Sequence, residues 1–239
     1  MKPTLYLFPN LLDENGSVEA FLPASVAAAV SRIDGIIAES EKGARKFLRR
    51  FSFPEPKTFR DIPIQLLNEH TQTKQLDELL SPIVKGQTWG LVSDCGLPCL
   101  ADPGSNLVYK ARQRGIAIET FSGPSSVIYA LLLSGLSAQH FTFHGYLAKE
   151  EAKRLAQLKT IETRSREEQS THLCIEAPYR NQKLLTYLLQ NLKPETTLCV
   201  AADLTLPTQW VMTQTVGAWR KQTLPDIDQR PTVFVFRAN

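Results

Sequence analysis

Several signatures of common protein classes are missing from this sequence. It contains no Walker A motif and no Gly-x-Gly-x-x-Gly fingerprint, which argues against a common nucleoside-triphosphate or nicotinamide site. No apolar stretch approaches the roughly 20 residues that span a bilayer, and the apolar run at the N-terminus is too short for a signal peptide. We therefore expect a cytoplasmic protein.

Cysteine is scarce, with four residues in 239. Their spacing fits no zinc signature, and an intracellular enzyme would keep the thiols reduced. His140 and His144 lie four residues apart, but the aromatic run around them is typical of a strand or loop rather than of a helix. The sequence therefore predicts no metal site. A net charge of +3 neither requires nor excludes a nucleic-acid partner.

Short β-like runs alternate with helical patterns, which predicts an α/β fold of two domains with mostly parallel sheets. The predicted strands are 4–8, 33–38, 89–92, 116–121, 172–176, 197–202 and 232–237. The predicted helices are 23–31, 41–51, 74–85, 105–114 (capped by Ser105 or Asn106), 125–133, one from 150, and 181–191. Ser122-Gly123-Pro124 breaks the pattern, so we place the domains at 1–119 and 120–239 and expect a cleft between them.

The segment Val92–Gly104 is the most informative loop. An apolar strand runs into a loop that holds the carboxylates of Asp94 and Asp102, two glycines and two prolines. Ligands of α/β sheets bind at loops that follow the carboxyl ends of strands, and glycines let the backbone approach a ligand closely. For Asp102 we favour a structural role as the cap of the following helix.

A second polar segment, Gly123-Pro124-Ser125-Ser126, opens an apolar helix. Free N–H groups and two hydroxyls at a helix start are able to hold a polar ligand. A plain N-cap explains the same residues equally well.

Together these segments resemble the tetrapyrrole-methylase superfamily, and within it most closely the branch of 16S rRNA ribose 2′-O-methyltransferases. That branch shows Ser-Asp-Ala-Gly-Thr-Pro, Ser-Asp-Pro-Gly and Pro-Gly-Pro-Ser-Ala where this chain has Ser93–Pro98, Ala101–Gly104 and Gly123–Ser126. Further matches, in order, are Ser134–Leu136, Phe141–Leu147, Glu176–Arg180 and Ala202–Thr205. The ordered set covers nearly the whole chain.

The resemblance implies an S-adenosylmethionine-dependent methyltransferase, usually a homodimer, with the cofactor in the interdomain cleft. The residues that it implies for cofactor binding are Pro9, Asp94, Gly96, Leu97, Ser125, Ser126, Glu176, Ala177, Ala202, Asp203 and Leu204. Two segments depart from the branch. The loop after the first strand lacks its Gly-Asn pair, and Ala38–Lys42 replaces its Ala-Glu-Asp-Thr-Arg. Tyr179 also stands where the branch has the histidine of Ser-Pro-His-Arg. These departures bear on the substrate rather than on the cofactor.

One helix bears on the substrate independently of the resemblance. Its cations fall at i, i+3, i+4, i+7 and i+8, which predicts a single cationic face that suits RNA phosphates. A solvated helix face is the alternative. The residues are Lys42, Arg45, Lys46, Arg49 and Arg50.

Three functional classes follow from these patterns. Ribose methylation of ribosomal RNA, on the small subunit, ranks first. A small-molecule methylase of the tetrapyrrole type ranks second, because such enzymes carry Gly-Asp-Pro where Asp94–Pro98 stands, and a non-catalytic protein with the same fold ranks third. Methyl transfer to a hydroxyl benefits from a general base. Glu39 and Asp94 follow strands and are the candidates, with a capping or cofactor-binding role as the alternative for each.

Overall fold

The first half of the chain folds into a five-stranded parallel sheet in the computed structural model, which describes residues 3–239. Each strand is a short apolar run, and helices fill the crossovers that parallel neighbours require. The elements are β1 (Thr4–Phe8), α1 (Val18–Phe21), α2 (Ala24–Val30), β2 (Gly35–Ala38), α3 (Glu41–Leu48), β3 (Ile64–Leu66), α4 (Gln75–Val84), β4 (Trp89–Val92), α5 (Ser105–Gln113) and β5 (Ala117–Thr120).

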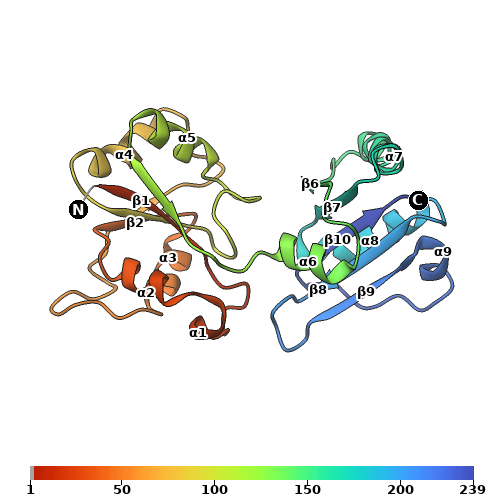
Figure 1. Ribbon diagram of the computed structural model, residues 1–239, viewed down its shortest axis with the longest axis horizontal. Helices are drawn as coiled ribbons and strands as arrows, with labels where there is room; N and C mark the ends of the chain where they lie inside the picture. The colour runs from red at the N-terminus through yellow and green to blue at the C-terminus, as the bar shows by residue number, and fades with distance from the viewer. Residues whose placement is uncertain (1–2) are drawn as a thin grey trace. The chain divides into compact units, whose positions relative to one another are not determined.

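Helices cover both faces of this sheet (Figure 1). On one face α2 and α3 bury Val30 and Phe47 together with Ile36 of β2. On the other face α4 buries Leu80 together with Ile37 of the same strand. Ile36 and Ile37 enter different cores because successive side chains of a strand point to opposite faces.

The strand order β3-β2-β4-β1-β5 places β1 beside β4. The chain leaves β1 toward β2 and leaves β4 toward β5, which are opposite directions in the sheet. The carboxyl ends of β1 and β4 therefore form the topological switch point, where open α/β sheets bind their ligands.

The second half forms a mixed five-stranded sheet of order β6-β7-β10-β8-β9. Its elements are α6 (Ser126–Ser134), β6 (Phe141–Tyr146), α7 (Glu151–Glu167), β7 (Thr171–Ile175), η1 (Pro178–Arg180), α8 (Asn181–Asn191), β8 (Thr197–Ala202), β9 (Trp210–Thr215), α9 (Val216–Trp219) and β10 (Thr232–Arg237). β6 pairs with β7 in parallel, and the other neighbours are antiparallel. Since β7 and β8 both run antiparallel to β10, their carboxyl ends lie on the same side of the sheet, at the ends of the strands.

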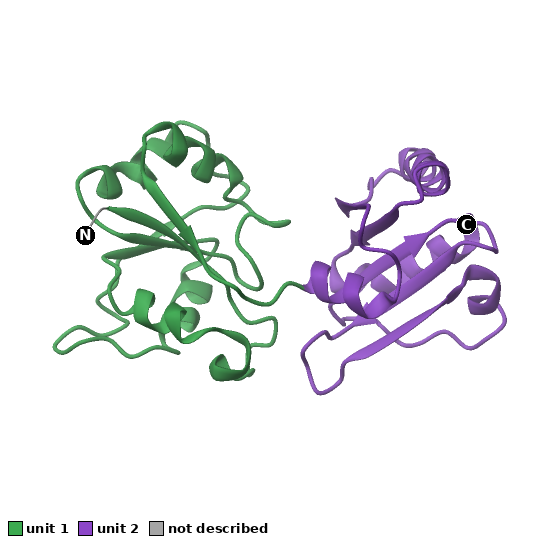
Figure 2. Cartoon of the chain, in the orientation of Figure 1, with its two compact units in different colours: residues 1–125 green, residues 126–239 purple. Residues whose placement is uncertain are grey.

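The chain divides into two compact units, Met1–Ser125 and Ser126–Asn239 (Figure 2). The predicted α/β class is confirmed, with a fully parallel sheet in the first unit and a mixed one in the second. The units meet between Ser125 and Ser126, and the boundary predicted after residue 119 falls inside β5. Within residues 3–239 no helix combines the length and apolar character needed to cross a membrane.

The predicted cap of α5 is wrong. Ser105 is the first residue of the helix and Asn106 the second, so neither is in the capping position. The N-cap is Gly104, whose φ of 143° is open to glycine but strained for other residues.

A pair of histidines, one buried and one half-buried, joins β6 and β7. His172 is 1% exposed, its Nδ1 lies 2.8 Å from His144 Nε2, and its Nε2 lies 2.9 Å from the Ser170 hydroxyl. The two imidazole rings stack with centroids 5.1 Å apart, and the His172 ring also stacks on Phe236. Burial lowers the pKa of His172 to about 4, with His144 and Arg164 adding to the effect. The His172 side chain is therefore neutral at pH 7.

Protonation of His172 should destabilise the fold in mild acid. The unfolded chain binds this proton near the ordinary pKa of 6.5 and the folded chain only near pH 4, so stability is lost as the pH falls between these values. Thermal unfolding from about pH 7.5 to 4.5 should show a smaller fall in melting temperature for His172→Gln than for the wild type. His140→Gln, at an exposed histidine, is the matched control and should keep the full fall. Parallel profiles for His172→Gln and wild type would contradict this assignment.

Candidate functional site

Asn10 joins the loops that follow β1 and β4. It is 3% exposed, and its side-chain nitrogen donates to the carbonyl oxygens of Ser93 and Asp94, each at 2.9 Å. Its main chain forms an antiparallel bridge with Gly96. Its Oδ1 accepts from Arg50 Nη1 at 2.6 Å. The polar atoms of this buried side chain are thus satisfied, and the loop after β4 is fixed against the loop after β1.

The Asp94 side chain lies at the N-terminus of α3. Ser40 caps this helix by accepting from the Gly43 N–H at 2.9 Å, and the same hydroxyl donates to Asp94 Oδ1 at 3.1 Å. Gly43 leaves room for this carboxylate, because a Cβ at position 43 would overlap the Asp94 side chain and displace it. Asp94 is otherwise exposed, so its carboxylate is free to accept hydrogen bonds from a ligand.

Two further carboxyl groups lie beside this loop. Glu39 follows β2 and accepts from the Asp94 N–H at 3.2 Å, and Asp102 lies near the other end of the loop that Asp94 begins. Both interact with the buried Ser93 hydroxyl. Burial raises the pKa of Glu39 above its usual range and raises the pKa of Asp102 to about 7, where the Glu39 charge adds to the effect. A carboxyl group with the pKa of Asp102 exchanges protons near neutral pH.

The predicted cofactor residues of the first unit meet at this edge. A Cβ on Gly123 would overlap the Pro9 ring, so the ends of β1 and β5 are in close contact. Ser125 follows there and is 4% exposed. Leu97 lines an apolar pocket of about 540 Å³ between Leu97–Leu100 and Thr120–Gly123. A more polar pocket of about 360 Å³ opens toward α3, and Asp94 is among its lining residues.

The predicted cofactor residues of the second unit follow the carboxyl ends of β7 and β8, which lie on the same side of the second sheet. Glu176 and Ala177 follow β7, and Asp203 and Leu204 follow Ala202 at the end of β8. The side chains of two of them already have partners. Glu176 accepts from Arg180 Nη2 at 2.6 Å, and buried Asp203 accepts from Arg230 Nε at 2.7 Å. Ser126 begins α6 in the same unit.

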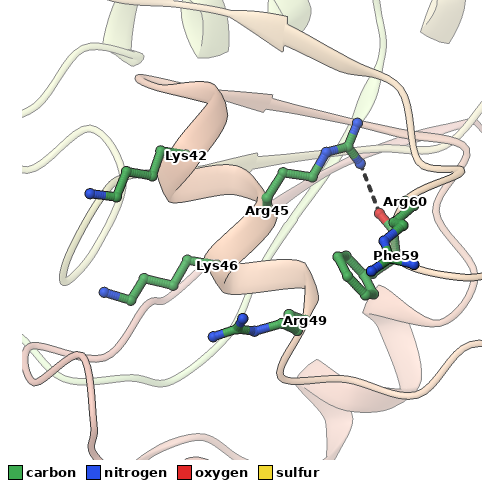
Figure 3. Close-up of a pocket in the computed structure, with 6 residues that line it drawn as sticks. All are labelled: Lys42, Arg45, Lys46, Arg49, Phe59 and Arg60. Atoms are coloured by element: carbon green, nitrogen blue, oxygen red, sulfur yellow. Dashed lines mark hydrogen bonds between the residues drawn. The ribbon is translucent and has the colours of Figure 1, made fainter.

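Arg45 does not belong to a free cationic face. Its Nη1 donates to the carbonyl oxygens of Phe59 at 2.8 Å and Ile62 at 2.9 Å (Figure 3). Arg45 therefore holds the loop before β3 against α3. The prediction of a phosphate-binding role for Arg45 does not fit this geometry, because its guanidinium already binds two main-chain carbonyls.

The other predicted cations differ in whether they already have a partner. α3 ends at Leu48, so Arg50 lies beyond it and donates to Asn10. Lys46 forms an ion pair with Glu14 of the loop after β1. The prediction of a single face of five cations is thus wrong, because α3 ends before Arg50 and because helical spacing cannot reveal that Glu14 of another segment pairs with Lys46. Lys42 and Arg49 are exposed and make no ion pair within residues 3–239. Figure 3 shows Lys42, Lys46 and Arg49 extending to the same side of α3.

Sequence reasoning missed three members of this site. Asp102 was expected to cap α5, which is wrong, since no side chain forms that cap. The position of Asn10 directly after β1 was a signal that was not used. Ser40 gave none, because 54 residues separate it from Asp94.

Metal ligands are not part of this arrangement. In the described part of the chain no three His, Cys, Asp or Glu side chains are grouped closely enough to hold a metal ion. Cys95, Cys99, Cys174 and Cys199 are free thiols.

Comparison with known proteins identifies the class. A sequence profile of the tetrapyrrole (corrin/porphyrin) methylases matches residues 22–219. The chain therefore belongs to this family, and the resemblance drawn from its loop motifs is confirmed together with the predicted enzyme class, a methyltransferase. Two solved structures share the fold over 98% of this chain. They are the methyltransferase CobJ (TM-score 0.62, 15% identity, 92% of that chain) and a uroporphyrin-III C-methyltransferase from Thermus thermophilus (0.53, 17%, 94%).

Similar proteins of known name form a smaller group within the family. The chain is 31% identical to the ribosomal RNA small subunit methyltransferase I of Xylella fastidiosa, over 84% of this chain and 69% of that protein. It is 30% identical to the protein of the same name from Vibrio cholerae, over 85% and 65%. The Synechocystis protein of that name is 32% identical over 80% and 64%. The chain thus spans about two thirds of the length of these relatives.

Replacing Asn10 by Ala should loosen the loop that carries Asp94. The change leaves the buried carbonyl of Ser93 and the partly buried carbonyl of Asp94 without their donor, which should lower the free energy of unfolding by about 1–3 kcal/mol. Chemical denaturation measures this loss. Asn15→Ala, at an exposed position of the same loop, is the matched control and should change stability by less than about 0.5 kcal/mol. Equal effects of the two substitutions would show that the Asn10 contacts contribute nothing.

Asp102→Asn should stabilise the fold at pH 8. The pKa of this carboxyl is about 7 in the folded chain against an ordinary 3.8, so folding favours its protonated form, and the stability that this form gives is lost as the pH rises through 7. The amide avoids that loss. Differential scanning calorimetry should show a melting temperature higher by a few degrees at pH 8, on the scale of about 2–4 °C per kcal/mol. The gain should shrink as the pH falls toward 4, and a gain independent of pH would refute the assignment.

Proposed function

We propose that the chain is an S-adenosylmethionine-dependent methyltransferase that methylates a ribose 2′-hydroxyl of small-subunit ribosomal RNA. The observation that carries this proposal is the meeting of Pro9, Asp94, Gly96 and Leu97 at the switch point of the first sheet, in a chain of the methylase family. The names of the relatives from Xylella fastidiosa and Vibrio cholerae support RNA as the acceptor. The predicted homodimer stays a prediction.

The residues of the first unit fit the cofactor chemically. The apolar pocket beside Leu97 suits an adenine ring, and the exposed Asp94 carboxylate suits hydroxyl or ammonium donors. Gly96 has a φ of 72°, which lets the main chain approach a ligand without a side chain in the way. In the second unit we assign main-chain contacts to Ala177 and Ala202–Leu204, since the Asp203 carboxylate already binds Arg230.

The reaction requires a proton acceptor as well as a methyl donor. When bound, S-adenosylmethionine supplies an electrophilic methyl group on a sulfonium sulfur. Transfer to a hydroxyl breaks the C–S bond, forms a C–O bond and releases the hydroxyl proton. We assign this proton to Glu39, because burial raises the pKa of this carboxyl and because it lies beside the Asp94 loop. We assign cofactor binding to Asp94, whose carboxylate Ser40 orients.

The roles assigned to Glu39 and Asp94 predict different effects on kcat and on cofactor affinity. Glu39→Gln should lower kcat for methylation of ribosomal RNA by about 100-fold or more, the range of a lost general base, and leave cofactor affinity nearly unchanged. Asp94→Ala should weaken cofactor binding by about tenfold or more, as expected when hydrogen bonds to a charged group are lost. Calorimetric titration with the cofactor and mass-spectrometric mapping of ribose methylation measure the two effects. Glu41→Gln is the matched control, because this exposed carboxylate lies two residues beyond Glu39.

Three outcomes would count against the proposal. No heat and no thermal shift at millimolar cofactor would reject cofactor binding. Cofactor binding without methylation of small-subunit RNA would favour the small-molecule acceptor. An unchanged kcat for Glu39→Gln would remove Glu39 as the base.

A further inference from the structure

A pocket of about 520 Å³ beside α3 combines cations with an aromatic ring (Figure 3). One wall is formed by the cations of α3 and its C-cap, which are Lys42, Arg45, Lys46 and Arg49. The opposite wall is the turn at Phe59 and Arg60. The Arg60 guanidinium lies 5.2 Å from the centre of the Phe59 ring. Among residues 3–239 no carboxylate lines this pocket.

The wall at Phe59 is held in place before any ligand arrives. Arg45 binds the carbonyls of Phe59 and Ile62, so it is a positioning residue here. The Asp61 carboxylate accepts from both the N–H and the hydroxyl of Thr58 at 2.8 Å, which closes the turn. The Phe59 ring also packs against the core of the first unit. The pocket is therefore preformed.

The same helix connects this pocket with the candidate reaction site. Lys42 and Lys46 line both this pocket and the polar pocket that contains Asp94. Lys42 lies at the end of α3 next to Asp94, and Arg49 lies at the other end, about 10 Å further along the helix axis at 1.5 Å per residue. A chain-like ligand is thus able to lie along α3 and contact both pockets.

We propose that the pocket binds the single-stranded RNA segment next to the acceptor nucleotide, with phosphates at Lys42, Arg49 and Arg60 and one base against Phe59. The inference rests on the proposed function, because it takes RNA as the acceptor. Lys42 and Arg49 make no ion pair within residues 3–239 and are able to bind a polyphosphate backbone, and an aromatic ring beside a guanidinium stacks an unpaired base. Lys46 contributes less, since Glu14 already neutralises it.

The test uses a fluorescent 12-nucleotide single-stranded RNA of mixed sequence, with polyglutamate of equal charge as a second probe. Lys42→Gln/Arg49→Gln should raise the Kd for RNA by about tenfold or more and flatten its salt dependence by about 1.4 log units per log salt, the value for two lost single-strand contacts. Phe59→Leu should weaken RNA binding by at least about fivefold and leave polyglutamate binding unchanged. Arg60→Gln, at an exposed residue, repeats the test without touching the core.

Lys85→Gln/Arg112→Gln removes the same charge from exposed positions of the same unit and is the matched control. Cofactor titration should be unchanged in Phe59→Leu, in Arg60→Gln and in this control, none of which touches the pocket that contains Asp94. If Lys42→Gln/Arg49→Gln matches this control, the pocket inference is overturned even where the wild type methylates ribosomal RNA. If the wild type does not methylate ribosomal RNA but loses RNA binding with the pocket variants, the proposed function fails and the pocket stands. Equal affinity for polyglutamate and RNA would overturn the stacked base.

Discussion

The candidate site depends on how the loops after β1 and β4 are held together. Strand pairing between them ends at Phe8 and Val92, and the main-chain groups beyond need other partners. Asn10 supplies them, because its side chain donates to two carbonyls of one loop and accepts from Arg50. The path of the loop that carries Asp94 is therefore set by one buried side chain where the sheet has ended.

α3 connects the Asp94 loop with the exposed cations of the first unit. The N-terminal end of the helix faces the Asp94 loop through Ser40 and Gly43, and Phe47 is buried in the core. Lys42 and Arg49 are left exposed. A helix of eight residues thus fixes the spacing between the candidate cofactor loop and the cations. Any shift of the loop after β1 would move both, because Arg50 joins Asn10 to the end of the same helix.

Strands such as β1 and β4 could be predicted because they are short, almost wholly buried apolar runs. β3 of the same sheet was missed, since it has only three residues and none of them is buried. β9 could not be predicted either, since Trp210–Thr215 mixes polar and apolar residues and pairs with β8 alone at the sheet edge. The ordered loop motifs sufficed for the family and for the place of Asp94. They could not show that Arg45 and Arg50 bind main-chain and side-chain oxygens, because those partners lie 14 and 40 residues away in sequence.

Charge is divided along this edge of the first unit. Glu39 and Asp102 both interact with the Ser93 hydroxyl, and no cation within residues 3–239 is among the causes of either pKa shift. The free cations instead follow α3 away from that point. A cation within about 4–6 Å would favour the charged carboxylate and lower both pKa values. The separation therefore leaves the pKa of Glu39 raised and that of Asp102 at about 7, while phosphate is attracted further along the helix. A ribonucleotide matches this division, because its 2′-hydroxyl is neutral and its phosphate is anionic.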